Sequence, residues 1–221
     1  MPTAAEKIPS PQARNFLQYA RAHQLLALAI GLTLLTAISA FFGSQMLAIP
    51  GSGPGGMIGV PMRRELPIAF AALAAGSLNS RMGQFELAAG PNLRVYEIWH
   101  VLIAGSVSVA LVGGTEFFAS GAGLAIVLAR ACVIWFGLAL LSGRIFGRKL
   151  SWIIPVATIF PLTYLGQDGE GQARWWDWTG QPPESIPCWA IAMVSTACGM
   201  AAFLLTPWHV RAFLPARNGH V

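Results

Sequence analysis

Charged residues are scarce in this chain. Asp, Glu, Lys and Arg make up only 10% of its 221 residues, against about 25% in soluble domains. Hydrophobic residues make up 55%, and the mean hydropathy is +0.58. So few polar groups cannot cover the surface of a fold in water. The composition excludes an ordinary soluble domain and predicts a chain whose outer surface faces lipid.

The chain also lacks a run of basic residues. Its formal net charge is +5, but the Lys and Arg residues stand in ones, twos and threes at the edges of apolar segments. A protein that follows a nucleic-acid backbone concentrates its cations on one stripe or face. The pattern therefore argues against nucleic acid as a partner and is typical of loops beside a membrane.

Sets of catalytic or metal-binding residues are missing as well. The chain has only three cysteines, each within an apolar run and without ligand spacing: Cys132, Cys188 and Cys198. Its four histidines stand at or beyond membrane edges without an H-E-x-x-H pattern: His23, His100, His209 and His220. No phosphate-binding loop is recognisable. We therefore expect no catalytic residues, no metal and no cofactor in this chain.

Long apolar runs are what the sequence does contain. A helix needs about 20 such residues to cross the hydrocarbon core. The runs predict an all-α integral membrane protein with six transmembrane helices, at residues 25–49, 57–80, 98–118, 122–142, 150–166 and 187–206. The second span requires a helix that starts near Met57, with Arg63 and Arg64 snorkelling to the interface. The segment at 49–60 is interpreted as a Gly/Pro-rich turn.

The basic residues are distributed unevenly between the two sides of this six-span layout. With the N-terminus inside, ten cations fall in cytoplasmic pieces: Lys7, Arg14, Arg21, Arg81, Arg94, Arg144, Arg148, Lys149, Arg211 and Arg217. Three fall outside: Arg63, Arg64 and Arg174. This asymmetry follows the positive-inside rule. We expect a multi-pass protein of the plasma membrane with both termini cytoplasmic.

The ends of the chain differ from the 25–206 transmembrane domain. Residues 1–24 carry apolar and basic side chains at helical spacing, which predicts an amphipathic helix in the cytoplasmic interface. The alternative is a flexible tail. Residues 207–221 are interpreted as a cytoplasmic C-terminal tail.

Two features of the later spans are candidates for function. Arg130 falls within the fourth span, where burial costs about 2.5–3.5 kcal/mol on insertion scales, so it should face protein or a polar cavity. It either contributes to a translocation path or has a packing role, snorkelling or binding backbone carbonyls. Trp175, Trp176 and Trp178 stand in the loop before the sixth span. They are interpreted as an outer aromatic belt, and the alternative is a lid over a translocation path.

A half-polar stretch, SRMGQFELAAGPNLRVYEIWH at residues 80–100, separates the second span from the third. It predicts a short cytoplasmic helix at 82–90, broken at Gly90–Pro91. Glu86 is then free for a charge-assisted contact.

The pattern of Gly83, Glu86, Pro91 and Arg94 resembles the coupling segment of ABC-2 type transporter membrane subunits. The match of Arg81 is offset by one residue. The stretch LARACVIWFGLALLSGRIFGRKLSWIIP is similar to the junction of spans four and five in actinobacterial members.

This resemblance implies a permease subunit that exports a small molecule, lipid or peptide. It implies that ATP and Mg are bound by a separate ATP-binding subunit, which docks on the coupling helix. It also implies a homodimer, or pairing with a similar permease. The alternatives are a non-transporting accessory or immunity protein and an intramembrane lipid-modifying enzyme.

Overall fold

The computed structural model describes residues 18–50, 57–79 and 91–205, which are mostly helical. The helices are α2 (Leu25–Phe42), α3 (Met62–Gly76), α5 (Pro91–Ser120), α6 (Ala122–Phe146), the 3-10 turn η1 (Arg148–Leu150), α7 (Ile153–Ala157), α8 (Ile159–Leu165) and α9 (Ile186–Leu205). Residues 18–22 are helical too. The strands are β1 (Met46–Pro50) and β2 (Met57–Pro61), which pair antiparallel as a hairpin.

Four helices are long and apolar enough to cross a membrane: Leu25–Phe42, Arg94–Ser120, Ala122–Phe146 and Ile186–Leu205. Most of their outward-facing side chains are apolar, and on α2 Leu26, Ile30 and Leu34 are all more than half exposed. Water would disfavour such a surface and lipid would not. The predicted class of a helical, membrane-embedded protein agrees with these features.

The two remaining predicted spans are shorter helices. α3 has 15 residues, and the fifth predicted span is divided into α7 with 5 residues and α8 with 7. The break between α7 and α8 falls at Thr158, between Pro155 and Pro161. Pro161 has no N–H to donate to Ala157 O, and its ring clashes with that preceding turn, which explains the interruption at Thr158.

The segment after α2 was interpreted wrongly from the sequence. The helix that starts at Leu25 ends at Phe42 rather than Ile49, and Met57–Pro61 is a strand rather than the start of a helix. Pro50 and Pro61 resist a helix interior, and a strand end tolerates them. The third predicted span also starts earlier, because α5 begins at Pro91, a residue suited to a first helical position.

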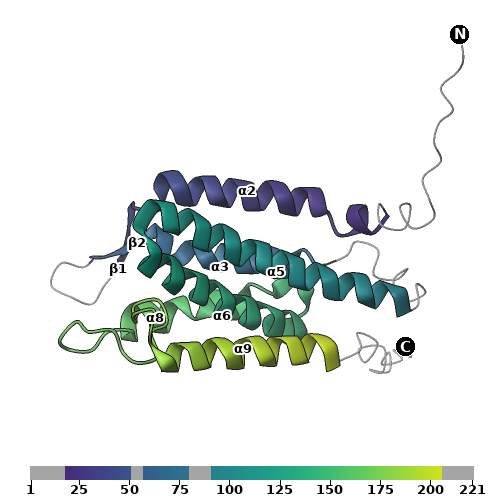
Figure 1. The fold of residues 1–221 in the computed structure, drawn as a ribbon. Helices are drawn as coiled ribbons and strands as arrows, with labels where there is room; N and C mark the ends of the chain where they lie inside the picture. The colour runs from purple at the N-terminus through teal and green to yellow at the C-terminus, as the bar shows by residue number, and fades with distance from the viewer. Residues whose placement is uncertain (1–17, 51–56, 80–90, 206–221) are drawn as a thin grey trace, which may run out of the picture.

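The helices of the bundle have two distinct ends (Figure 1). At the hairpin end lie β1 and β2, the C-terminus of α2 and the turn between α5 and α6. Gly121 alone links those two helices, with a φ of +91° that glycine adopts at little cost. The other end, called the histidine end after His23 and His100, contains the start of α2, the end of α3 and the start of α5.

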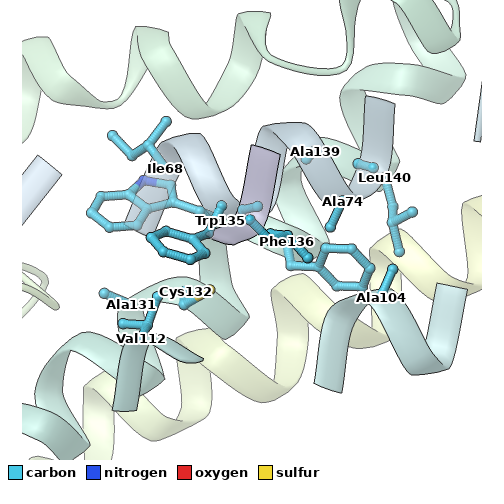
Figure 2. Packing of buried hydrophobic residues seen from close by; sticks show 14 of the residues in the cluster. Ile68, Ala74, Ala104, Val112, Ala131, Cys132, Trp135, Phe136, Ala139 and Leu140 are labelled. Atoms are coloured by element: carbon cyan, nitrogen blue, oxygen red, sulfur yellow. The ribbon is translucent and has the colours of Figure 1, made fainter. Parts of the chain in front are cut away.

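α6 is the central helix of the bundle, because it contacts α3, α5, α7 and α9. Figure 2 shows Trp135 and Phe136 of this helix among small side chains such as Ala74 of α3 and Ala104 of α5. Trp135 is fully buried, and its Nε1 donates to Thr158 Oγ1 at 2.9 Å. Large rings against small residues allow close packing where lipid supplies no hydrophobic drive for helix association.

Two glycines let α6 and α9 cross in backbone contact. A Cβ added at Gly199 would lie 2.3 Å from the carbonyl oxygen of Gly137. A Cβ added at Gly137 would lie 2.5 Å from the backbone of Ser195. Backbone atoms cannot move aside as a side chain can, so any larger residue forces the helices apart.

We predict that Gly199→Ala destabilises the bundle. Alanine gains about 1 kcal/mol of helix propensity over glycine, but overpacking costs about 1–3 kcal/mol, and the clash with backbone places the cost at the upper end. The matched control is Gly123→Ala, where the added Cβ meets nothing within 4 Å. The midpoint of unfolding in mixed detergent, followed by tryptophan fluorescence, should fall for Gly199→Ala and stay unchanged for Gly123→Ala. Equal midpoints for the two variants would contradict the close crossing.

Candidate functional site

Buried and half-buried polar side chains in the described part of the chain gather near the two ends of the bundle. At the histidine end they form one group, the histidine cluster: Tyr19, His23, Ser77, Glu97, His100 and Arg148. At the hairpin end they form two groups. One surrounds Glu116, and the other holds the loop at 166–185. The centre of the bundle between them is largely apolar.

His100 is the middle of the histidine cluster. The Ser77 hydroxyl donates its one proton to Ala74 O at 2.7 Å, so its oxygen accepts from His100 Nε2 at 3.0 Å. In the neutral ring Nδ1 then carries the lone pair and accepts from the Tyr19 hydroxyl at 3.1 Å. This arrangement joins residues 18–22, α3 and α5 through one imidazole.

His23 extends the same cluster toward α2. Its ring lies 4.2 Å from that of Tyr19 and 5.6 Å from that of His100, centroid to centroid. Its Nδ1 lies 3.4 Å from Ser77 O. Sequence reasoning placed both histidines at membrane edges and gave them no role. Residue order did not indicate that the two histidines pair, because they lie 77 positions apart and meet only in the folded bundle.

Arg148 closes the cluster from the α6 side. It pairs with Glu97 of α5 at 2.7 Å and donates to Leu78 O, just beyond α3, at 2.5 Å. Leu78 precedes the predicted coupling segment and Glu97 follows it. The cluster therefore fastens both flanks of that segment to each other and to η1.

The predicted coupling residues are only partly within the described structure. Gly83 and Glu86 lie outside the described residues, as does the whole 82–90 helix. Pro91 is the first residue of α5, and Arg94 is exposed and donates to Leu204 O in the last turn of α9. A cation at a helix C-terminus satisfies a free carbonyl and complements the helix dipole.

Arg130 is fully buried, and its guanidinium binds carbonyls of the 166–185 loop. One terminal nitrogen donates to Pro182 O at 2.9 Å, and the other donates to Gln181 O at 2.8 Å and Trp178 O at 3.1 Å. The central carbon of the guanidinium (Cζ) also lies 5.9 Å from the ring centre of Trp189. These contacts correspond to the carbonyl-binding alternative considered for this residue.

Asp177 is the second fixed point of that loop and was missed in the sequence. It is buried and accepts from Thr179 N, Thr179 Oγ1 and Gly180 N at 2.7–3.1 Å. Arg64 of α3 reaches both of its carboxylate oxygens at 3.0 Å. The available signal was the order Asp-x-Thr-Gly, which favours a turn closed by the Asp side chain.

The three loop tryptophans have different surroundings. Trp175 is 66% exposed. Trp178 packs edge-on against Trp135 of α6, with ring centroids 6.3 Å apart, and Trp176 is packed against the core. Only Trp175 of the three is exposed as a residue of an aromatic belt would be. The other two attach the loop to the bundle.

Glu116 lies at the hairpin end of α5, almost entirely buried. Its oxygens accept from Ser39 of α2 and from Ser120, each at 3.2 Å, and Arg63 of α3 lies 3.6 Å away. This group ties three helices together beside the hairpin. In the described residues no group of three or more His, Cys, Asp or Glu side chains is arranged to hold a metal ion.

No protein family, curated protein or solved structure matches this chain.

We predict that Arg130→Leu frees the loop without unfolding the bundle. Leucine leaves the carbonyls of Trp178, Gln181 and Pro182 without their donor, and each buried unsatisfied group costs about 1–3 kcal/mol. Hydrogen exchange of loop peptides in detergent should become faster, notably at the Thr179 and Gly180 amides. Arg174→Leu, which changes an exposed arginine of the same loop, is the control. Unchanged exchange in Arg130→Leu would contradict the assignment.

We also predict energetic coupling between Arg148 and Glu97. Their side chains are each only 11% exposed, so removing one partner leaves a largely buried charge, at a cost approaching 3–5 kcal/mol for full burial. Arg148→Met and Glu97→Gln should each lower the midpoint of unfolding in mixed detergent, and the double variant should lose less than the two losses combined. Lys149→Met, exposed in the same turn, is the control. Additive losses would show that the pair is not coupled.

Proposed function

We propose that this chain is the membrane subunit of an ABC-2 type transporter and exports a small molecule, lipid or peptide. A separate subunit would bind and hydrolyse ATP with Mg. The observation that carries the proposal is the motif of Gly83, Glu86, Pro91 and Arg94, which resembles the coupling segment of that family. The segment connects α3 to α5, the place that it occupies in the family's layout.

The arrangement of the helices supports this proposal. Four membrane-length helices, together with α3 and the α7–α8 pair, would give six passes. The histidine end contains Arg148 and Lys149 and both flanks of the coupling segment. In our proposal this end faces the cytoplasm, in keeping with the positive-inside rule. The hairpin and the 166–185 loop then face outward.

The histidine cluster offers a physical route for coupling. In the proposed cycle, closure of the ATP-binding subunits displaces the segment between α3 and α5. Ser77 and Leu78 on one flank, and Glu97 and His100 on the other, are bonded across the cluster. A displacement of the segment therefore reaches α3, α5 and η1 together, as a switch between two bundle conformations requires. A pair of such subunits would provide the translocation path between them.

The experiment that tests the proposal uses Glu86→Ala in the full-length chain. A carboxylate that pairs with a cation on a docked partner contributes up to about 3–5 kcal/mol if the pair is fully buried, and much less at an exposed surface. Glu86→Ala should weaken co-purification of the ATP-binding subunit, or uncouple its ATPase activity from transport, and leave membrane insertion intact. Glu170→Ala, on the exposed loop of the other end, is the control.

Two results would overturn the proposal. If no ATP-binding subunit co-purifies with the parent chain, the alternative of a non-transporting accessory or immunity protein takes its place. If Glu86→Ala and Glu170→Ala both behave like the parent, the segment is an ordinary connection between two helices.

A further inference from the structure

Within the residues that the structure describes, no further strand pairs with either edge of the β1–β2 hairpin. Its strands pair only with each other, in the register Met46 with Pro61 through Pro50 with Met57, and they form the one named sheet of the described residues. A two-stranded hairpin alone is at best marginally stable in water. Its outer edges also present N–H and C=O groups that need hydrogen-bonding partners.

The base of the hairpin is fastened to the bundle. Met62 N donates to Gln45 O at 2.8 Å, and Arg63 N donates to Gly43 O at 2.9 Å. Arg63 Nε donates to the same oxygen of Gly43 at 3.2 Å, and its guanidinium faces Glu116 and Ser120. Val60 is buried at this base. The position of the hairpin relative to the helices is therefore set.

The strands of the hairpin are apolar, and no charged side chain lies near them on the α2 side. No Asp, Glu, Lys or Arg occurs between Arg21 and Arg63, an interval that includes all of α2 and the hairpin. Met46 is 67% exposed and Leu47 is 41% exposed. Phe41 and Phe42, at the adjoining end of α2, are more than half exposed, and so are Phe117 and Phe118 near the end of α5. The apolar surface of α2 thus continues onto β1 with no charged residue between them.

These properties exclude two of the three environments available to the hairpin. Bulk water would leave the exposed Met and Phe side chains hydrated at a cost of about 25 cal/mol per Å² of apolar area. The hydrocarbon core would leave the open strand edges without hydrogen-bonding partners, and open edges do not occur there. The boundary between headgroups and acyl chains accommodates both, because it is apolar below and supplies water and headgroup donors and acceptors above.

We propose that the β1–β2 hairpin is a lipid-binding anchor that lies in the headgroup–acyl boundary of the bilayer. Its partner is the phospholipid surface around the hairpin end. Met46, the more exposed of the two strand residues, enters the upper acyl region together with Phe41 and Phe118. The anchor determines how deep the ends of α2 and α3 lie, and Arg63 and Glu116 form the fixed polar base beneath it. The proposal rests on membrane embedding and is independent of the transporter assignment.

The test places an environment-sensitive fluorophore on the hairpin of the full-length protein in phosphatidylcholine vesicles. Cys198, the exposed cysteine, is replaced by alanine, whereas Cys132 and Cys188 are buried and remain. A nitrobenzoxadiazole label is attached to Met46→Cys, and the matched control carries it at Glu170→Cys on the exposed loop. Vesicles contain phospholipid with a nitroxide either near the top of the acyl chain or near its end.

The Met46 label should emit at shorter wavelength than the Glu170 label. The shallow nitroxide should quench it strongly and the deep one more weakly, whereas the Glu170 label should stay water-exposed and unquenched. Equal, water-like emission from both labels would overturn the proposal, since the hairpin would stand in solvent. Blue-shifted emission without lipid quenching would also overturn it, since a second copy or another protein would then cover the hairpin. Stronger quenching by the deep nitroxide would place the hairpin in the hydrocarbon and contradict the argument from its edges.

Discussion

The buried guanidinium of Arg130 is the group on which the hairpin end of this structure depends. It lies on the central helix α6 with no exposed surface, where an unsatisfied charge is costly in a membrane protein. Carbonyl oxygens between Trp178 and Pro183 satisfy its terminal nitrogens. These carbonyls can converge only if the loop forms a tight turn. The Asp177 side chain closes that turn, and Arg64 binds Asp177 from α3. One charge on α6 thus organises the loop that leads into α9.

Apolar contacts hold the middle of the bundle and polar contacts hold its ends. This division is expected in lipid, because the hydrophobic effect does not drive helices together there. In the middle, association depends on close packing, as between Gly137 and Gly199 or between Phe136 and Gly105. Near the ends, hydrogen bonds and ion pairs join helices that are distant in sequence. Tyr19 meets His100, Ser39 meets Glu116, and Arg148 meets Glu97. The polar groups therefore set which helices lie together at each end of the bundle.

Part of this arrangement could be predicted from residue order. The apolar runs predicted the four membrane-length helices, and the insertion cost of a charge predicted that Arg130 would be buried against protein. The partner of Arg130 could not be predicted, because backbone carbonyls belong to every residue and carry no signal in the sequence. The hairpin was missed for a different reason. Its strands are as apolar as a helix span, so hydropathy alone did not separate them, although Pro50 and Pro61 argued against a continuous helix.

The sequence by itself determined that the chain is embedded in a membrane, because that property depends on local composition over about 20 residues at a time. It also contained the prolines beside the break between α7 and α8 and at the ends of the hairpin strands, although Pro67 lies inside α3 without breaking it. Only the tertiary structure decided which polar groups meet. His23 and His100, Arg64 and Asp177, and Arg63 and Glu116 are brought together by the packing of whole helices. The energy of such contacts depends on distances that residue order alone does not specify.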